Sequence, residues 1–162
     1  KRAAKPTAAV IRGGGLSSAY WAATGADRIF ASANSQVGSI GVTMSYLDNI
    51  EHNRQEGFTL NQLSSGKFKD SGNPDKPLTE EERVLFLRDV EIMHDNFVHA
   101  VSANRRLDTG AVQALADGSS MLGEMALTRG LIDALGGIVE ASEYLEGVIG
   151  EDVAICWGGQ NN

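Results

Sequence analysis

Short apolar runs alternating with helical segments are the feature that most constrains how this chain of 162 residues can fold. Brief apolar runs bounded by glycine or polar residues are typical of buried strands, and helices between them favour parallel pairing. The pattern predicts strands at residues 7–12, 27–31, 39–44, 58–63, 131–133 and 153–157. The fold class that follows is α/β with mainly parallel strands.

Helices are predicted between these strands, at residues 17–26, 46–55, 109–116, 123–129 and 138–148, with the strongest helix beginning near Thr79. Thr79 and Glu82 have the spacing of a capping box. Beyond them one apolar face recurs at steps of three and four, with Phe86, Val90, Met93, Phe97 and Val101. Gly57 is expected to end the helix at 46–55, since glycine readily takes the left-handed conformation.

Composition excludes several classes of protein. Neither a repeat nor a linker divides the chain, so we predict one domain over residues 1–162 with a polar tail at 158–162. No apolar stretch approaches the ~20 residues of a membrane-spanning helix. The formal net charge of −7 repels phosphate backbones, so no nucleic acid partner is expected. Cys156 is the single cysteine, which excludes an internal disulfide, and its apolar run predicts an inert core side chain.

No metal or cofactor site is predicted. His52, His94 and His99 are the only histidines, and none of them has the i, i+4 spacing of a zinc-binding helix. Gly13-Gly14-Gly15 follows a predicted strand but lacks the Gly-x-Gly-x-x-Gly pattern and the lysine of a phosphate-binding loop.

Two segments carry candidate catalytic chemistry. The glycine run leads to Ser17 and Ser18 at a predicted helix start, where free backbone N–H groups stabilise an oxyanion. Spacing alone favours the simpler interpretation that one of these serines caps the helix. Lys67 and Lys69 lie in the polar loop at 64–77, which taken alone is typical of a solvated basic loop.

Together these segments resemble the signal peptide peptidase A family of serine proteases, peptidase family S49. Four stretches occur in the family's order: residues 17–29, the sequence VGSIGV at 37–42, SGKFKD at 65–70 with PLTEEER at 77–83, and residues 123–137. The resemblance runs from Pro6 to about Leu145 and therefore covers nearly the whole chain.

The resemblance implies a ClpP/crotonase-like spiral of short parallel strands and helices, and a Ser/Lys catalytic dyad. It assigns Ser17 as the nucleophile and Lys69 as the general base, with Lys67 as the rival base. Ser39 then orients the lysine, and the backbone N–H of Ser18 donates to the oxyanion. A lysine serves as a base only when neutral, so burial away from a counter-ion must lower its pKa from about 10.4. We therefore expect the neighbouring Asp70 side chain to point away from Lys69.

The chain departs from the family pattern in two places. Ser18 and Ala19 stand where the family usually has two glycines. The family's upstream half, with a Ser-Pro-Gly-Gly stretch that supplies a second oxyanion donor, has no counterpart here. The chain is therefore expected to be the C-terminal part of a protease domain, lacking the N-terminal portion of the fold.

The expected function is a serine endopeptidase acting on released signal peptides or other membrane-proximal peptides. The alternatives are a phage-type head-maturation protease of the same family, a catalytically inactive oligomeric scaffold, and a crotonase-type acyl-CoA enzyme on the related fold. The resemblance also implies a homo-oligomer, a partnership with the missing N-terminal part of the same protein, and an intact protein that is membrane-associated, with its active domain outside the cytoplasm.

Overall fold

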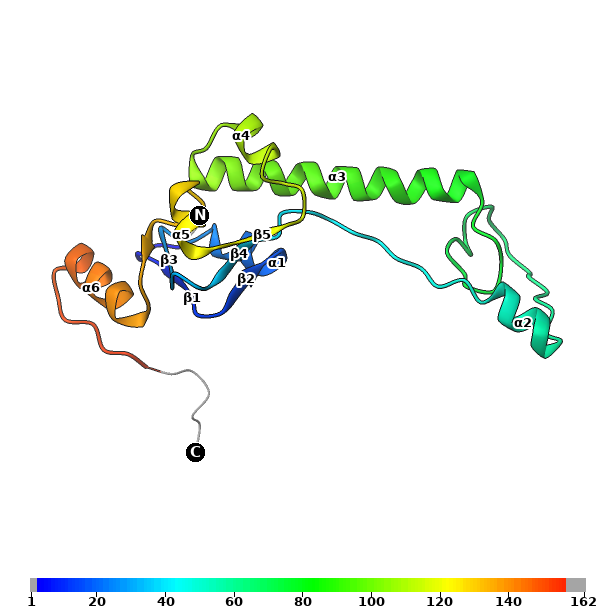
Figure 1. The fold of residues 1–162 in the computed structure, drawn as a ribbon, viewed down its shortest axis with the longest axis horizontal. Helices are drawn as coiled ribbons and strands as arrows, with labels where there is room; N and C mark the ends of the chain where they lie inside the picture. The colour runs from blue at the N-terminus through cyan, green and yellow to red at the C-terminus, as the bar shows by residue number, and fades with distance from the viewer. Residues whose placement is uncertain (1–2, 157–162) are drawn as a thin grey trace. The chain divides into compact units, whose positions relative to one another are not determined.

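The computed structural model describes residues 3–156, which divide into two compact units (Figure 1). The first unit combines the residues up to Gly41 with those from Asn96 onward, and the second is Val42–Asp95. Compactness does not test whether either unit folds alone, so the single domain stays a prediction.

The first unit contains two three-stranded sheets, and Figure 1 labels their strands β1 to β5. One sheet is parallel throughout and has the order β1 (Ala8–Ile11), β3 (Arg28–Ala31), β6 (Ala134–Leu135). The other has the order β2 (Gly14–Leu16), β4 (Gln36–Gly38), β5 (Ser120–Leu122), with β2 and β4 parallel and β5 antiparallel to β4. The predicted mixed α/β class with mainly parallel pairing is confirmed.

The helices are α1 (Ser18–Ala23), α2 (Ile50–Glu56), α3 (Glu80–Arg105), α4 (Thr109–Gln113), α5 (Gly123–Thr128) and α6 (Ile138–Ile149). Each predicted helix has a counterpart, although α2 begins four residues later than predicted and α4 ends three residues earlier. Gly57 ends α2 with a φ of 76°, as expected. The capping box is present, because the Thr79 N–H donates to Glu82 Oε2 at 2.9 Å and the Glu82 N–H donates to Thr79 Oγ1 at 3.2 Å.

Several predicted strands are wrong. Residues 39–44, 58–63 and 153–156 do not pair as strands in the described chain, and residues 157–162, including the predicted tail, lie outside it. Apolar alternation is present at 58–63, but these residues pair with no described strand. No strand forms at the predicted residues 131–133. β6 instead begins at Ala134, directly after the end of the predicted strand. Cys156 is exposed rather than buried in a core strand, because its segment is not part of a sheet.

The core of the first unit joins the two sheets to α1 and to the C-terminal half of α3. It contains fully buried side chains from both sheets and both helices, among them Ile29, Val37, Tyr20, Phe97 and Val101. The Trp21 ring stacks on Phe97, with centroids 4.7 Å apart. The apolar face predicted for α3 is therefore core at Phe97 and Val101, whereas Met93 is 41% exposed.

Polar contacts inside this core fix the start of β6. The Tyr20 hydroxyl donates to the Leu131 carbonyl at 2.8 Å, and burial raises the pKa of the Tyr20 phenol. Arg105 donates to both carboxylate oxygens of Asp133, at 2.9 and 2.7 Å, and Asp133 accepts the Ile29 N–H at 2.7 Å. These bonds tie α1, α3 and β3 to one loop.

Among the helices of residues 3–156, none combines the length and the apolarity needed to cross a membrane.

Replacing Tyr20 by Phe should lower the free energy of unfolding by about 1–2 kcal/mol, because the Leu131 carbonyl loses its buried donor. Tyr46→Phe is the matched control, since Tyr46 is 51% exposed. Denaturant unfolding followed by circular dichroism measures both variants. Equal changes in the two would show that the buried hydrogen bond contributes nothing particular.

Candidate functional site

Ser17 lies at a sharp turn from β2 into α1. Its backbone has a φ of 52° and a ψ of −125°, and a non-glycine residue at such a positive φ carries strain of order 1–3 kcal/mol. The Ser17 N–H donates to the Gly38 carbonyl at 2.8 Å, and the Ser17 carbonyl accepts the Trp21 N–H at 2.9 Å. The backbone of Ser17 is therefore held on one side by β4 and on the other by α1.

The hydroxyl of Ser17 does not cap the helix. Ser17 occupies the N-cap position of α1, but its side chain makes no capping hydrogen bond. The simpler interpretation from spacing, in which this hydroxyl is a cap, is therefore wrong for Ser17. Ser17 and Ser18 are both exposed. Ser18 is the first residue of α1, so its N–H has no carbonyl partner within the helix. A strained, exposed serine at a strand-to-helix turn is the arrangement found at hydrolase nucleophiles.

Ser39 occupies the matching position on the neighbouring strand. β2 and β4 are parallel, with Leu16 opposite Gly38, so Ser17 and Ser39 each follow the carboxyl end of their strand. Ser39 also has a positive φ, of 50°, and it is half-buried. Neighbouring strands lie about 4.8 Å apart, so the register brings these two predicted site residues together.

A turn before β5 holds Ser39 from its other side. The Ser39 N–H donates to the Ser119 carbonyl at 2.9 Å, and the Gly118 N–H donates to the Ile40 carbonyl at 3.0 Å. Asp117 Oδ1 accepts the Ser119 hydroxyl at 2.6 Å and the Ser119 N–H at 2.9 Å, and these bonds lower the pKa of Asp117. The sequence marks Asp117-Gly118 only as a turn, because its contact with Ser39 depends on tertiary pairing.

The two candidate lysines lie in the second unit, in the loop between α2 and α3. Lys67 Nζ is paired with Glu81 Oε1 at 2.7 Å and lies 5.2 Å from the centroid of the Phe68 ring. Lys69 is exposed, and within residues 3–156 its amine makes no hydrogen bond or ion pair. Asp70 accepts a hydrogen bond from Asn73 Nδ2 at 2.9 Å rather than pairing with Lys69.

These contacts distinguish the two lysines. The amine of Lys67 donates to a carboxylate oxygen of Glu81, whereas the amine of Lys69 makes no such contact within residues 3–156. The second unit alone does not give Lys69 the burial that a neutral amine requires. Ser17, Ser18 and Ser39 belong to the first unit, so the pairing of Ser17 with Lys69 stays a prediction.

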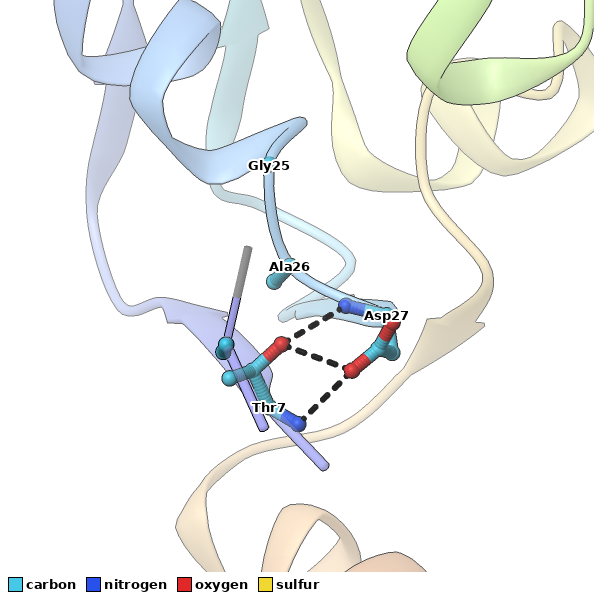
Figure 2. Close-up of a pocket in the computed structure, with 5 residues that line it drawn as sticks. Thr7, Gly25, Ala26 and Asp27 are labelled. Carbon is cyan, nitrogen blue, oxygen red and sulfur yellow. Dashed lines mark hydrogen bonds between the residues drawn. The ribbon is translucent and has the colours of Figure 1, made fainter. Parts of the chain in front are cut away.

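Figure 2 shows a small hollow beside the start of β1, lined by Ala3, Thr7, Gly25, Ala26 and Asp27. The Thr7 N–H and hydroxyl both donate to Asp27 Oδ2 at 2.9 Å, and the Asp27 N–H donates to Thr7 Oγ1 at 3.0 Å. These reciprocal bonds join β1 to the turn before β3. No predicted site residue lines this hollow.

Within residues 3–156, no three His, Cys, Asp or Glu side chains gather closely enough to hold a metal ion.

Ser17→Gly should be more stable than Ser17→Ala by about 1 kcal/mol in free energy of unfolding, because glycine takes a φ of 52° without strain at Cβ. Glycine should have the opposite effect on the free energy of unfolding at the next position, in Ser18→Gly. This variant should lose about 0.5 kcal/mol relative to the unchanged protein, since Ser18 lies in a helix. Denaturant unfolding of the three variants measures this order, and a Ser17→Gly variant less stable than Ser17→Ala would contradict the strain.

Comparison with known proteins places the chain in a family. The chain matches the family model of peptidase family S49 over residues 1–149. It is 33% identical over 142 residues to a putative protease of Methanocaldococcus jannaschii, covering 88% of this chain and 46% of that protein. It is 35% identical over 130 residues to a putative signal peptide peptidase SppA of Enterococcus faecium, covering 80% and 38%. A chloroplastic serine protease SPPA of Arabidopsis thaliana is 30% identical over 138 residues, covering 85% of this chain and 20% of that protein.

The chain thus spans less than half the length of each of these relatives. Since the family match covers most of its residues, the chain belongs to peptidase family S49.

Proposed function

We propose that this protein is a serine endopeptidase that hydrolyses peptide bonds with Ser17 as the nucleophile and Lys69 as the general base. The observation that carries the proposal is the conformation of Ser17, a strained residue with an exposed, uncapping hydroxyl at a strand-to-helix turn. Such strain persists only where the surrounding structure enforces it, and it gathers at functional sites. Membership of a peptidase family supports hydrolysis as the reaction.

In the proposed reaction, Lys69 Nζ takes the proton of Ser17 Oγ as Oγ attacks the scissile carbonyl carbon. The Ser18 N–H donates to the oxyanion of the tetrahedral intermediate. The intermediate collapses to an acyl group on Ser17, and the departing amine takes its proton from Lys69. Water then attacks the acyl group, with Lys69 again accepting the proton and Ser17 Oγ leaving as the hydroxyl. Ser39, next to Ser17, is an uncharged hydrogen-bond partner for the amine and does not hold it protonated.

The base requires a neutral lysine, and Lys69 is exposed in its own unit. The proposal therefore includes assembly that buries Lys69, either in a homo-oligomer or with an upstream part of the same protein. Two features support assembly. Among the described strands, β1 and β2 are sheet edges, with backbone groups free to pair. The second unit also exposes large apolar side chains, including Leu47, Phe58 and Leu63.

The proposed fold is the ClpP/crotonase-like spiral. In support, β3 adds parallel to β1 and β4 adds parallel to β2 in the same chain order. Each pass of the chain therefore contributes one strand to each sheet, as a spiral of short strands requires.

The proposed substrates are released signal peptides or other membrane-proximal peptides, and the proposed location of the intact protein is a membrane surface outside the cytoplasm. Support for the substrate class comes from the relative named as a putative signal peptide peptidase.

Hydrolysis of a fluorogenic apolar peptide across about pH 6 to 10 tests the dyad. Ser17→Ala and Lys69→Ala should each lower kcat/KM by about 10³-fold or more, because nucleophile and base act as a unit. Lys67→Ala is the matched control and should stay within about threefold of the unchanged protein. The rate should rise with pH across this range, since a lysine general base accepts a proton only as the neutral amine.

Three outcomes would contradict the proposal. Loss of activity in Lys67→Ala with retention in Lys69→Ala would reassign the base. Full activity in Ser17→Ala would show that Ser17 is not the nucleophile. An unchanged protein that stays inactive even when joined to the upstream segment of an S49 relative would be a scaffold of this fold rather than a peptidase.

A further inference from the structure

We propose that Glu82 is a positioning residue for Lys69, because it anchors to the start of α3 the loop of residues 66–77 that carries the proposed base. This inference rests on the proposed function, and it adds a residue that acts on the base through the backbone of the loop.

Glu82 is the buried anchor of this loop. It is 3% exposed, and its Oε1 accepts a hydrogen bond from Lys76 Nζ at 2.6 Å in an ion pair whose side chains are 4% and 17% exposed. Its other oxygen accepts the Thr79 N–H at 2.9 Å. The bond from Lys76 and then that from the Thr79 N–H lower the pKa of Glu82 to about 2. The carboxylate is therefore charged at every pH at which a lysine could act as a base.

A chain of hydrogen bonds runs from Asp75, the residue before Lys76, back to Asp70, the residue after Lys69. The Asp75 N–H donates to Asn73 Oδ1 at 2.8 Å, and Asn73 Nδ2 donates to Asp70 Oδ2 at 2.9 Å. The Lys69 N–H itself closes a turn on the Gly66 carbonyl at 3.1 Å. Residues 57–69 are exposed and residues 70–76 are half-buried, so Lys69 is the last exposed residue before the anchored stretch.

The same loop packs on α3 one turn beyond Glu82. Gly72 has a φ of 75°, and a Cβ at this position would lie 3.1 Å from Cζ of the Phe86 ring. Phe86 follows Glu82 by four residues, so both contacts lie on one face of the helix. The loop therefore has two points of attachment to α3, one ionic and one formed by close packing.

The neighbouring ion pair, between Lys67 and Glu81, is exposed rather than buried. Lys67 and Glu81 form a pair of similar length, 2.7 Å, but their side chains are 63% and 62% exposed. Solvent and salt weaken such a pair, so it holds the loop far less firmly. Glu81 therefore provides a control of the same residue type at the adjacent position.

Positioning matters because a general base must come within about 2.6–3.2 Å of the proton it accepts. A displacement of about 1 Å costs on the order of 10²-fold in rate. Releasing the loop from Glu82 should therefore lower kcat, because the base is displaced, and should leave KM for the peptide nearly unchanged.

The experiment compares Glu82→Gln with Glu81→Gln in the otherwise unchanged protein. Glutamine at position 82 keeps the capping hydrogen bond to Thr79 and removes only the charge that pairs with Lys76. Hydrogen exchange of the loop amides, measured without substrate, should quicken about 10-fold or more in Glu82→Gln and stay within about twofold in Glu81→Gln. In peptide hydrolysis, kcat should fall about 10- to 100-fold in Glu82→Gln, with KM within about twofold. Adding Lys76→Gln to Glu82→Gln removes the unpaired charge and should restore part of the loss in both measurements.

Each other result overturns a specific part of the account. If hydrogen exchange of the loop amides is unchanged in Glu82→Gln, Glu82 does not anchor the loop. If exchange of the loop amides quickens in Glu82→Gln but kcat equals that of Glu81→Gln, the role of Glu82 is structural only. Faster exchange throughout both units would lead to the same conclusion. If Lys69→Ala keeps its activity, or if the unchanged protein has none even when joined to the upstream segment of an S49 relative, the proposed function fails. The positioning role then fails with it, whatever the exchange shows.

Discussion

The hydrogen bond from the Ser17 N–H to the Gly38 carbonyl, 2.8 Å long, is the constraint on which the candidate site depends. It extends the β2–β4 ladder one residue past the end of β2 and holds Ser17 at a positive φ where α1 begins. The same ladder puts Ser39 at the end of the neighbouring strand, where the turn at Asp117 holds it. A short parallel strand pair thus sets the positions of two serines.

The two parts of the proposed chemistry are supported by different forces. Ser17 carries backbone strain, which the packed core offsets; beneath β2 the Ile11 side chain fills the space where a Cβ on Gly15 would come within 2.6 Å. Lys69 lies in an irregular loop with no sheet to hold it, and a buried ion pair between Lys76 and Glu82 joins that loop to the start of α3. Hydrogen bonds of the sheet hold the proposed nucleophile, whereas an ion pair between side chains attaches the loop that carries the proposed base.

Local signals predict the helices, and tertiary pairing decides what the sequence does not predict. The capping pair Thr79 and Glu82 and the glycine stop at Gly57 are read directly from neighbouring residues. β2 and β5 are three-residue strands whose pairing depends on partners distant in the chain, so no local pattern predicts them. In the site, motif resemblance identifies Ser17, Ser39 and Lys69 as candidates. It cannot supply the positive φ of Ser17, which depends on pairing with the distant Gly38, or the ion pair between Glu82 and Lys76, which depends on how the loop folds back onto the start of α3.

The most direct test of the central claim is chemical labelling of the nucleophile. A fluorophosphonate probe reacts with a serine hydroxyl that a nearby base activates, and mass spectrometry of the digested protein locates the modified residue. The account predicts one modification, on Ser17, and its loss in the Lys69→Ala variant. Modification of a different serine, or undiminished labelling of Ser17 in Lys69→Ala, would contradict it.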